Sequence, residues 1–236
     1  MPSLNPLLSG LEELSTFLSN YNLSAISSDP LFKKAIASLY KKYHPLLTWH
    51  SNLSLRKPRH FRDTTSLAIF RQYLCEVTSD SCYSILVWSQ GLYKPAHLLL
   101  RSAIENFIKC LGLYNGYPIL NITSVYDLFD AVKVQPIVNK NRDTQKEFGL
   151  LRASYSNLCG YVHSANTSYM SMTTALGTLP KFDNSESSIY TTNANRVFSS
   201  FINYLAIMFT IELQRMHHED SDLIYDALPK RIKSAM

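Results

Sequence analysis

The stretch that decides the fold is residues 98–109, Leu98-Leu99-Leu100-Arg101-Ser102-Ala103-Ile104-Glu105-Asn106-Phe107-Ile108-Lys109. On a helical wheel its apolar side chains gather on one face, which contains Leu100, Ile104 and Phe107. Charges at the border of an apolar face are costly unless they are paired. Arg101 and Glu105 have the i,i+4 spacing that allows a pair. The stretch therefore predicts an amphipathic helix over residues 95–114 with a charged pair at the edge of the core.

A second polar cluster belongs to a later apolar stretch that includes residues 155–164, Tyr155-Ser156-Asn157-Leu158-Cys159-Gly160-Tyr161-Val162-His163-Ser164. A helical wheel over residues 147–163 places Arg152 and His163 just beside the apolar face. His163 falls at the expected carboxyl end of this helix. Two interpretations of it stay open, namely a histidine satisfied by backbone carbonyls and a general acid or base.

Helical patterns with start and stop signals recur along the rest of the chain. They predict helices over residues 4–20, 29–42, 65–90, 95–114, 124–133, 143–163 and 192–218. Residues 51–62 are polar and basic and indicate a linker, and residues 165–190 indicate a long loop before the last helix. Residues 230–233 indicate a frayed tail. The prediction is an all-α bundle of four to five long helices.

Length and composition agree with a helical domain. A chain of 236 residues fits one domain with a small N-terminal addition. We expect a helical extension over 1–60, a helical bundle over 61–218 and a C-terminal tail over 219–236. A hydrophobic content of 46% with 17% charged residues permits a sizeable core. Only 7 glycines argue against a turn-rich barrel or sandwich.

Other sequence features predict a cytoplasmic protein without a metal or cofactor. The first residues lack the basic and apolar regions of a secretion signal. The longest apolar stretch, residues 197–213, contains serine and asparagine and predicts a core helix rather than a membrane span. Adjacent histidines at His217 and His218 point in different directions on a helix and chelate poorly. The formal charge of +5 permits an anionic partner but does not require one.

The densest basic run is residues 56–62, Arg56-Lys57-Pro58-Arg59-His60-Phe61-Arg62. Cations near phosphates strengthen nucleic-acid binding by releasing counterions, and an aromatic side chain such as Phe61 can stack on a base. The run therefore indicates Arg59 and Arg62 as contacts for RNA. The other interpretation is a solvated linker.

Taken in chain order, these pieces resemble the HEPN superfamily of helical bundles, and most of all its members among prokaryotic defence and abortive-infection proteins. The resemblance covers about residues 65–213 and rests on Gly91-Leu92-Tyr93, Leu99-Leu100-Arg101-Ser102-Ala103-Ile104-Glu105 and Tyr155-x-x-Leu158-Cys159-x-Tyr161-Val162-His163-Ser164. It implies an all-α bundle that is usually dimeric. Catalytic relatives cut RNA without a metal, using an arginine and a histidine from paired protomers.

This chain departs from those relatives in one respect. In them the arginine lies four to six residues before the histidine, whereas here that spacing before His163 falls on Leu158, Asn157 and Ser156. Arg152 lies farther upstream. Arg101 is then the candidate for the missing charge, supplied across the bundle.

Two functions follow from the resemblance. The first is a defence or toxin-type ribonuclease, in which Arg101, Glu105 and His163 are catalytic. Its RNA would be contacted by Tyr155, Asn157, Arg152, Arg59 and Arg62. The second is a non-catalytic module that binds a nucleotide, a nucleic acid or a protein partner from a defence operon and regulates it. The unusual spacing favours the second, and a purely structural role is a third interpretation.

Overall fold

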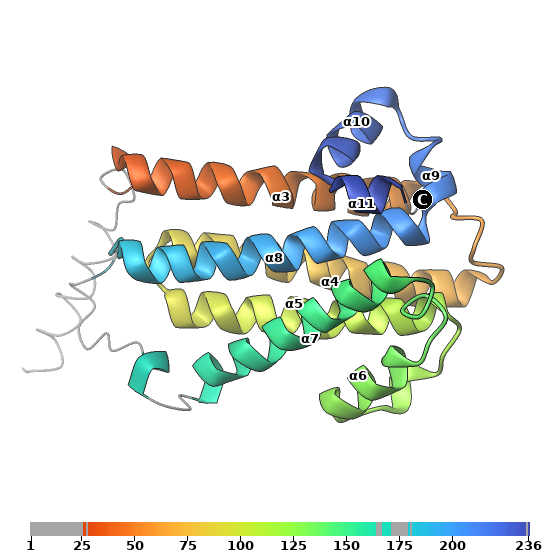
Figure 1. Ribbon diagram of the computed structural model, residues 1–236, viewed down its shortest axis with the longest axis horizontal. Coiled ribbons are helices and arrows are strands. Elements are labelled where there is room, and N and C mark those ends of the chain that lie inside the picture. Colours follow the sequence, from red (N-terminus) through yellow and green to blue (C-terminus); the bar gives the residue numbers. More distant parts are fainter. Residues whose placement is uncertain (1–25, 27, 164–166, 171–178, 180, 235) are drawn as a thin grey trace, which may run out of the picture.

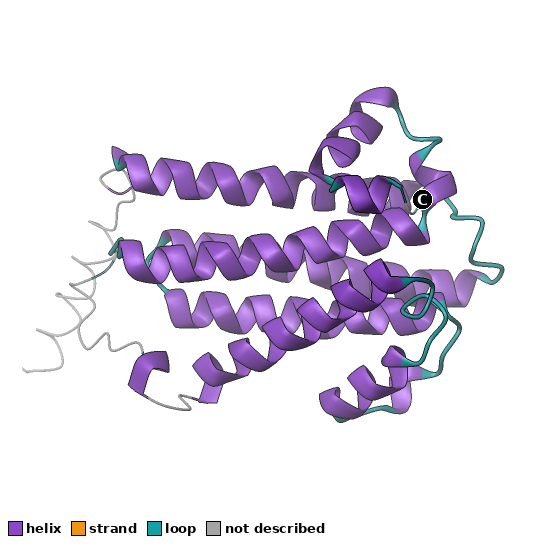
Figure 2. Ribbon diagram, viewed as in Figure 1, coloured by secondary structure: helices purple, strands orange, loops and turns teal. Residues whose placement is uncertain are grey.

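The structure is a computed structural model and describes residues 26, 28–163, 167–170, 179, 181–234 and 236 (Figure 1). Every secondary-structure element in this part of the chain is a helix (Figure 2). The predicted all-α class is confirmed. The helix that we expected over residues 4–20 lies outside the described residues, as does much of the loop expected over 165–190.

Long helices form the body of the molecule. They are α3 (Pro30–Leu55), α4 (Thr64–Ser89), α5 (Tyr93–Tyr114), α7 (Arg142–His163) and α8 (Asn184–Met208). Shorter elements are η1 (Ile119–Asn121), α6 (Val125–Lys133), η2 (Thr167–Tyr169), α9 (Thr210–Leu213), α10 (His218–Ala227) and α11 (Lys230–Lys233). Helices α4 and α5 form a hairpin, α8 packs against α3, α5 and α7, and α7 runs obliquely across α5 (Figure 1).

Polar side chains cap the starts of several helices. The side chains of Asp29, Asp63 and Ser124 accept hydrogen bonds from the backbone N–H groups of the first turns of α3, α4 and α6. Asp183 does the same for α8, and this start was not foreseen. The last long helix therefore begins at Asn184 rather than near residue 192, because its polar first turns still bury Tyr190.

Helix α3 continues through Pro45 to Leu55, so the helix end predicted near residue 42 and the linker predicted from residue 51 are wrong. A proline inside a helix costs about 3 kcal/mol. Trp49 and Leu53 are buried beyond it, and burying one large apolar side chain contributes about 1.5–3 kcal/mol. Tertiary packing therefore outweighs the local break. The division at residue 60 stays a prediction, but α3 shares its core with the helices that follow.

The predicted frayed tail is also wrong. Residues 218–233 form α10 and α11, and Ile224 and Ile232 are fully buried. The stretch 197–213 is a core helix, as predicted, with a break at Phe209 between α8 and α9. Within the described residues we find no helix with both the length and the hydropathy of a membrane span.

Candidate functional site

Arg101 and Glu105 of α5 and Tyr155 of α7 form a three-way polar cluster. The Nη2 atom of Arg101 lies 2.9 Å from Oε1 of Glu105 and donates to the Tyr155 hydroxyl at 2.7 Å. That hydroxyl donates in turn to Oε1 of Glu105 at 3.1 Å. The Arg101 guanidinium also lies 5.0 Å from the centre of the Tyr155 ring. The predicted i,i+4 pair of Arg101 and Glu105 is present, and α7 contributes Tyr155 as the third residue of the cluster.

The cluster sits at the edge of the core. The side chains of Arg101 and Glu105 are 23% and 22% exposed, whereas Tyr155 is buried. Burial acts to lower the pKa of Arg101, but the Tyr155 hydrogen bond and the Glu105 charge together raise it above its ordinary value. Burial raises the pKa of Tyr155 against the opposing hydrogen bond from Arg101. The phenol therefore stays protonated at neutral pH and can donate to the carboxylate.

The bonding also fixes what this cluster can do chemically. One terminal nitrogen of Arg101 serves both Glu105 and Tyr155. Its Nε is buried and has no hydrogen-bond partner in the described structure. The carboxylate neutralises the guanidinium and the phenol holds both in place, so the arginine is oriented but has little charge left for an anion.

The other predicted catalytic and contact residues of α7 lie apart from this cluster. His163 is exposed at the end of α7, eight residues beyond Tyr155, which is an axial rise of about 12 Å. Asn157 is exposed. Arg152 points toward α6, where its Nη1 lies 2.7 Å from Oδ1 of Asp130. Within one chain, the structure thus brings Arg101 and Glu105 together and leaves His163 apart.

His97 lies four residues before Arg101 on α5 but is fully buried. Its ring stacks on Tyr161 at 4.0 Å between centroids, and neither ring nitrogen has a hydrogen-bond partner among the described residues. Burial lowers the pKa of His97 to about 4. The sequence carried a weak sign of this burial, because Leu100 and Ile104 of the core face lie within about 60° of His97 on the helical wheel.

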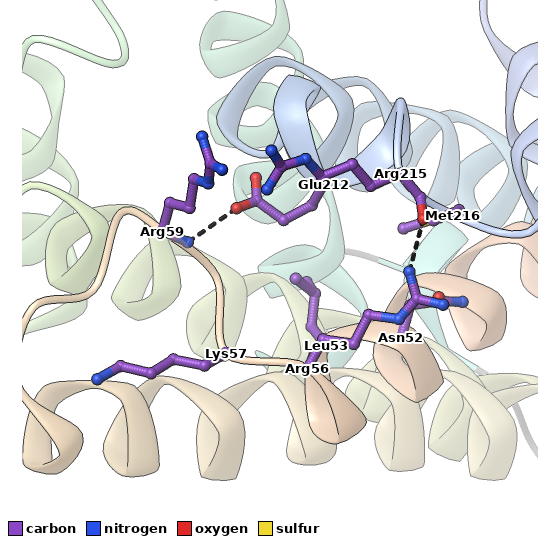
Figure 3. Close-up of a pocket in the computed structure, with 8 residues that line it drawn as sticks. All are labelled: Asn52, Leu53, Arg56, Lys57, Arg59, Glu212, Arg215 and Met216. Carbon is purple, nitrogen blue, oxygen red and sulfur yellow. Dashed lines mark hydrogen bonds between the residues drawn. The ribbon is translucent and has the colours of Figure 1, made fainter.

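A second candidate site is a basic pocket of about 140 Å³ at the end of the bundle, where the carboxyl end of α3 lies near the end of α9 and the residues that follow it (Figure 3). We call it the basic pocket, and its lining residues are Asn52, Leu53, Arg56, Lys57, Arg59, Glu212, Arg215 and Met216. The predicted contact Arg59 lines it. Arg62 is exposed nearby in sequence but is not part of the lining.

Backbone contacts hold the basic pocket together. Arg71 of α4 donates to the carbonyl oxygens of Leu53 and Arg56, each at 2.9 Å, and so caps the end of α3. Arg56 donates to the carbonyl of Arg215 at 2.7 Å. The backbone N–H of Arg59 donates to Oε1 of Glu212 at 2.9 Å. These bonds bring two segments far apart in sequence to one pocket.

The cationic side chains of the basic pocket outnumber its carboxylate. Lys57 extends away from Glu212, whereas the Arg59 side chain rises beside the Glu212 carboxylate (Figure 3). In the described part of the chain, no ion pair joins Lys57, Arg59 or Arg215 to a carboxylate. The pocket therefore has an excess of positive charge.

The predicted stacking role of Phe61 is wrong. Phe61 is 5% exposed and packs on Phe70, with ring centroids 5.0 Å apart. The neighbouring His60 stacks on Tyr114 at 3.7 Å. The basic run is thus anchored to the core by its aromatic residues, since they bury large apolar area there. A base cannot stack on Phe61 in this arrangement.

Comparison of the chain with family models, with curated proteins and with solved structures gives no match. The resemblance to the HEPN superfamily therefore stays a prediction. Among the residues that the structure describes, no three histidine, cysteine, aspartate or glutamate side chains gather as metal ligands would.

Proposed function

We propose that the chain is a HEPN-like binding module of a prokaryotic defence system that holds RNA through its phosphates at the basic pocket. The observation that carries this proposal is the charge of that pocket. Four cationic side chains, Arg56, Lys57, Arg59 and Arg215, line it with one carboxylate, that of Glu212.

The chemistry of the lining fits a nucleic acid. Each cation close to a phosphate releases counterions and so strengthens binding, and the guanidinium fork donates two parallel hydrogen bonds to phosphate oxygens. Leu53 and Met216 add an apolar surface against which a ribose or base can lie. An acidic peptide would meet the same cations, and we favour RNA because it presents a phosphate at every nucleotide.

The α5–α7 cluster supports binding rather than cleavage by one chain. RNA cleavage needs a base at the 2′-hydroxyl and a cation at the same phosphate. Arg101 is matched by Glu105, and His163 lies two helical turns from Tyr155. A single chain therefore does not supply the pair of groups at one phosphate.

Binding is tested with the full chain and a fluorescent single-stranded RNA. We expect the double variant Lys57→Gln/Arg59→Gln to bind at least about tenfold more weakly than the unaltered chain. The matched control is Lys33→Gln/Lys34→Gln, which removes two exposed lysines of α3 far from the pocket. Equal affinity of the two double variants would contradict the proposal.

A second candidate function is metal-independent cleavage by a homodimer that uses Arg101, Glu105 and His163. One observation favours it, namely the exposure of His163 at the end of α7, where a second copy can approach. The test incubates total RNA and tRNA with excess chelator. Cleavage by the unaltered chain that is lost in His163→Ala and Arg101→Ala would replace the binding module with a ribonuclease.

A further inference from the structure

A cleft of about 340 Å³ lies on α8, between α3 and α7, and the segment that joins α10 to α11 forms one of its walls. In Figure 1, α11 is drawn between α3 and α8 and runs in nearly the same direction as both. This cleft, which we call the α8 cleft, lies apart from the basic pocket and shares no lining residue with it.

The α8 cleft has an excess of positive charge. Its lining holds three cations, Lys42, Arg196 and Arg231, and one carboxylate, Glu147. Glu147 is 2% exposed, pairs with Arg231 and accepts a hydrogen bond from Ser200 at 2.6 Å. Arg231 is matched by Glu147 and also by Asp143, whose Oδ1 lies 3.0 Å from its Nη1, so Lys42 and Arg196 are the two cations of the lining that remain without an ion pair to a described residue.

Both remaining cations can still donate. Lys42 gives one hydrogen bond to the carbonyl of Ala227 at 3.2 Å, which leaves two of its three N–H groups. Arg196 is exposed at the mouth and forms no ion pair with a described residue. A ligand that carries two negative charges would satisfy this pair.

Asn203 supplies a second, independent observation. It lines the cleft and is 3% exposed. Its Oδ1 is buried without a hydrogen-bond partner in the described structure. A buried polar atom without a partner is unfavourable. Asn203 and Arg196 are seven residues apart and therefore share a helix face. An O–H donor placed between them would satisfy the amide.

We propose that the α8 cleft binds a small phosphate monoester with a free hydroxyl group, its phosphate on Arg196 and Lys42 and its hydroxyl on Asn203. A phosphate monoester carries about −1.5 to −2 charges at pH 7, which balances the charges of both cations. A monocarboxylate would leave one of the two cations without a negative partner. The volume lies at the small end of the range typical of small-molecule sites. This proposal does not depend on RNA binding.

The test is calorimetric titration of the full chain with glycerol 3-phosphate, methyl phosphate, glycerol and glycerate. We expect glycerol 3-phosphate to bind about tenfold more tightly than methyl phosphate, which lacks the hydroxyl, and glycerol not to bind. Glycerate should bind at least about tenfold more weakly than glycerol 3-phosphate. Equal binding of glycerate and glycerol 3-phosphate, or no binding of the phosphate ester, would overturn the proposal.

Variants locate the binding. Arg196→Gln should weaken glycerol 3-phosphate at least about tenfold, whereas the control Lys41→Gln, an exposed lysine next to Lys42, should leave it unchanged. Asn203→Ala should abolish the preference over methyl phosphate. Since Asn203 is buried and its variant is at risk of misfolding, the exposed Arg196 carries the decision. The same affinity in Arg196→Gln and Lys41→Gln would sink the proposal, whatever the RNA assay shows.

Discussion

Tyr155 shows how one hydroxyl can organise a charged pair. It accepts from Arg101 and donates to Glu105, so Tyr155→Phe removes both hydrogen bonds and keeps the ring. We expect the free energy of unfolding of this variant to be about 1–2 kcal/mol lower, since a hydrogen bond to a charged group contributes more stability than one between neutral groups. Urea unfolding measures the loss. The matched control is Tyr126→Phe, because Tyr126 is 56% exposed and its ring lies against Tyr155.

The control should change stability by less than about 0.5 kcal/mol. If Tyr155→Phe were equally neutral, the hydroxyl would not hold the pair. The i,i+4 spacing predicted the pair of Arg101 and Glu105, but no local pattern indicated Tyr155 as their partner. Its contact depends on how α7 crosses α5, which is a property of the tertiary packing.

His97 makes stability depend on pH. The pKa of His97 is about 4 in the fold, because burial disfavours the charged ring, against about 6.5 in an unfolded chain. Between these values the unfolded chain holds a proton that the folded chain does not. The contribution of the neutral ring to the free energy of unfolding is therefore fully present above about pH 6.5 and is lost as the pH falls toward 4. The loss amounts to about 3 kcal/mol.

Carboxylates also titrate in this interval, so the measurement compares two chains. His97→Phe keeps an aromatic ring against Tyr161 and removes the titration. We expect the variant to lose about 3 kcal/mol less than the unaltered chain when denaturant unfolding is repeated at pH 7 and pH 4. If both chains lost the same free energy of unfolding between pH 7 and pH 4, His97 would not be the cause of the loss of stability in acid.

At the scale of elements, the turn between α4 and α5 positions the start of α8. Gly91 has φ 75°, and a Cβ there would meet the backbone carbonyl of Lys181. The hydroxyl of Tyr93 accepts from the backbone N–H of Asp183 at 2.8 Å. Two residues of the motif that carried the family resemblance thus hold the segment that leads into α8.

Gly91→Ala should therefore destabilise more than Gly116→Ala. Gly116 also has a left-handed backbone, φ 71°, but has open space around its Cβ position. A left-handed alanine costs about 1–2 kcal/mol at either site. The clash with Lys181 adds to it only at residue 91, so we expect a difference of about 2 kcal/mol by thermal and urea unfolding. Similar losses of stability in both variants would mean that the segment around Lys181 moves aside without cost.

The C-terminal helix α11 is attached to α7 by charge. Arg231 lies 3.0 Å from Asp143 and pairs with the buried Glu147. Arg231→Ala leaves that carboxylate without its cation, and we expect a loss of about 2–3 kcal/mol, below the usual cost because Arg231 is partly exposed. Adding Glu147→Gln should recover about half of it or more. Urea unfolding is the measurement, and the exposed Lys233→Ala is the control.

A double variant no more stable than Arg231→Ala would show that packing of Ile232, rather than charge, attaches the tail. This attachment also explains a failure of prediction. Four residues with three cations indicate a solvated end when only local sequence is considered. Asp143 and Glu147, the partners of Arg231, lie more than eighty positions earlier.

Over the whole molecule, periodicity and caps predicted the helical class and the positions of α4 to α7, because these signals are local. They did not predict the passage of α3 through Pro45, since the compensating burial of Trp49 comes from other helices. The same limit applies to the basic pocket. The run at residues 56–62 was visible, but Glu212 and Arg215 reach it from the other end of the chain.

The net charge of +5 and the basic pocket make different contributions to RNA affinity, and salt separates them. The slope of log affinity against log salt is about −0.7 for each phosphate neutralised on single-stranded RNA. Lys57→Gln/Arg59→Gln should therefore reduce the slope by about 1.4, if both cations contact phosphates. The control Lys33→Gln/Lys34→Gln carries the same net charge and should keep the slope. Binding titrations between about 50 and 200 mM salt decide between them, because equal slopes in both variants would assign the affinity to net charge rather than to the basic pocket.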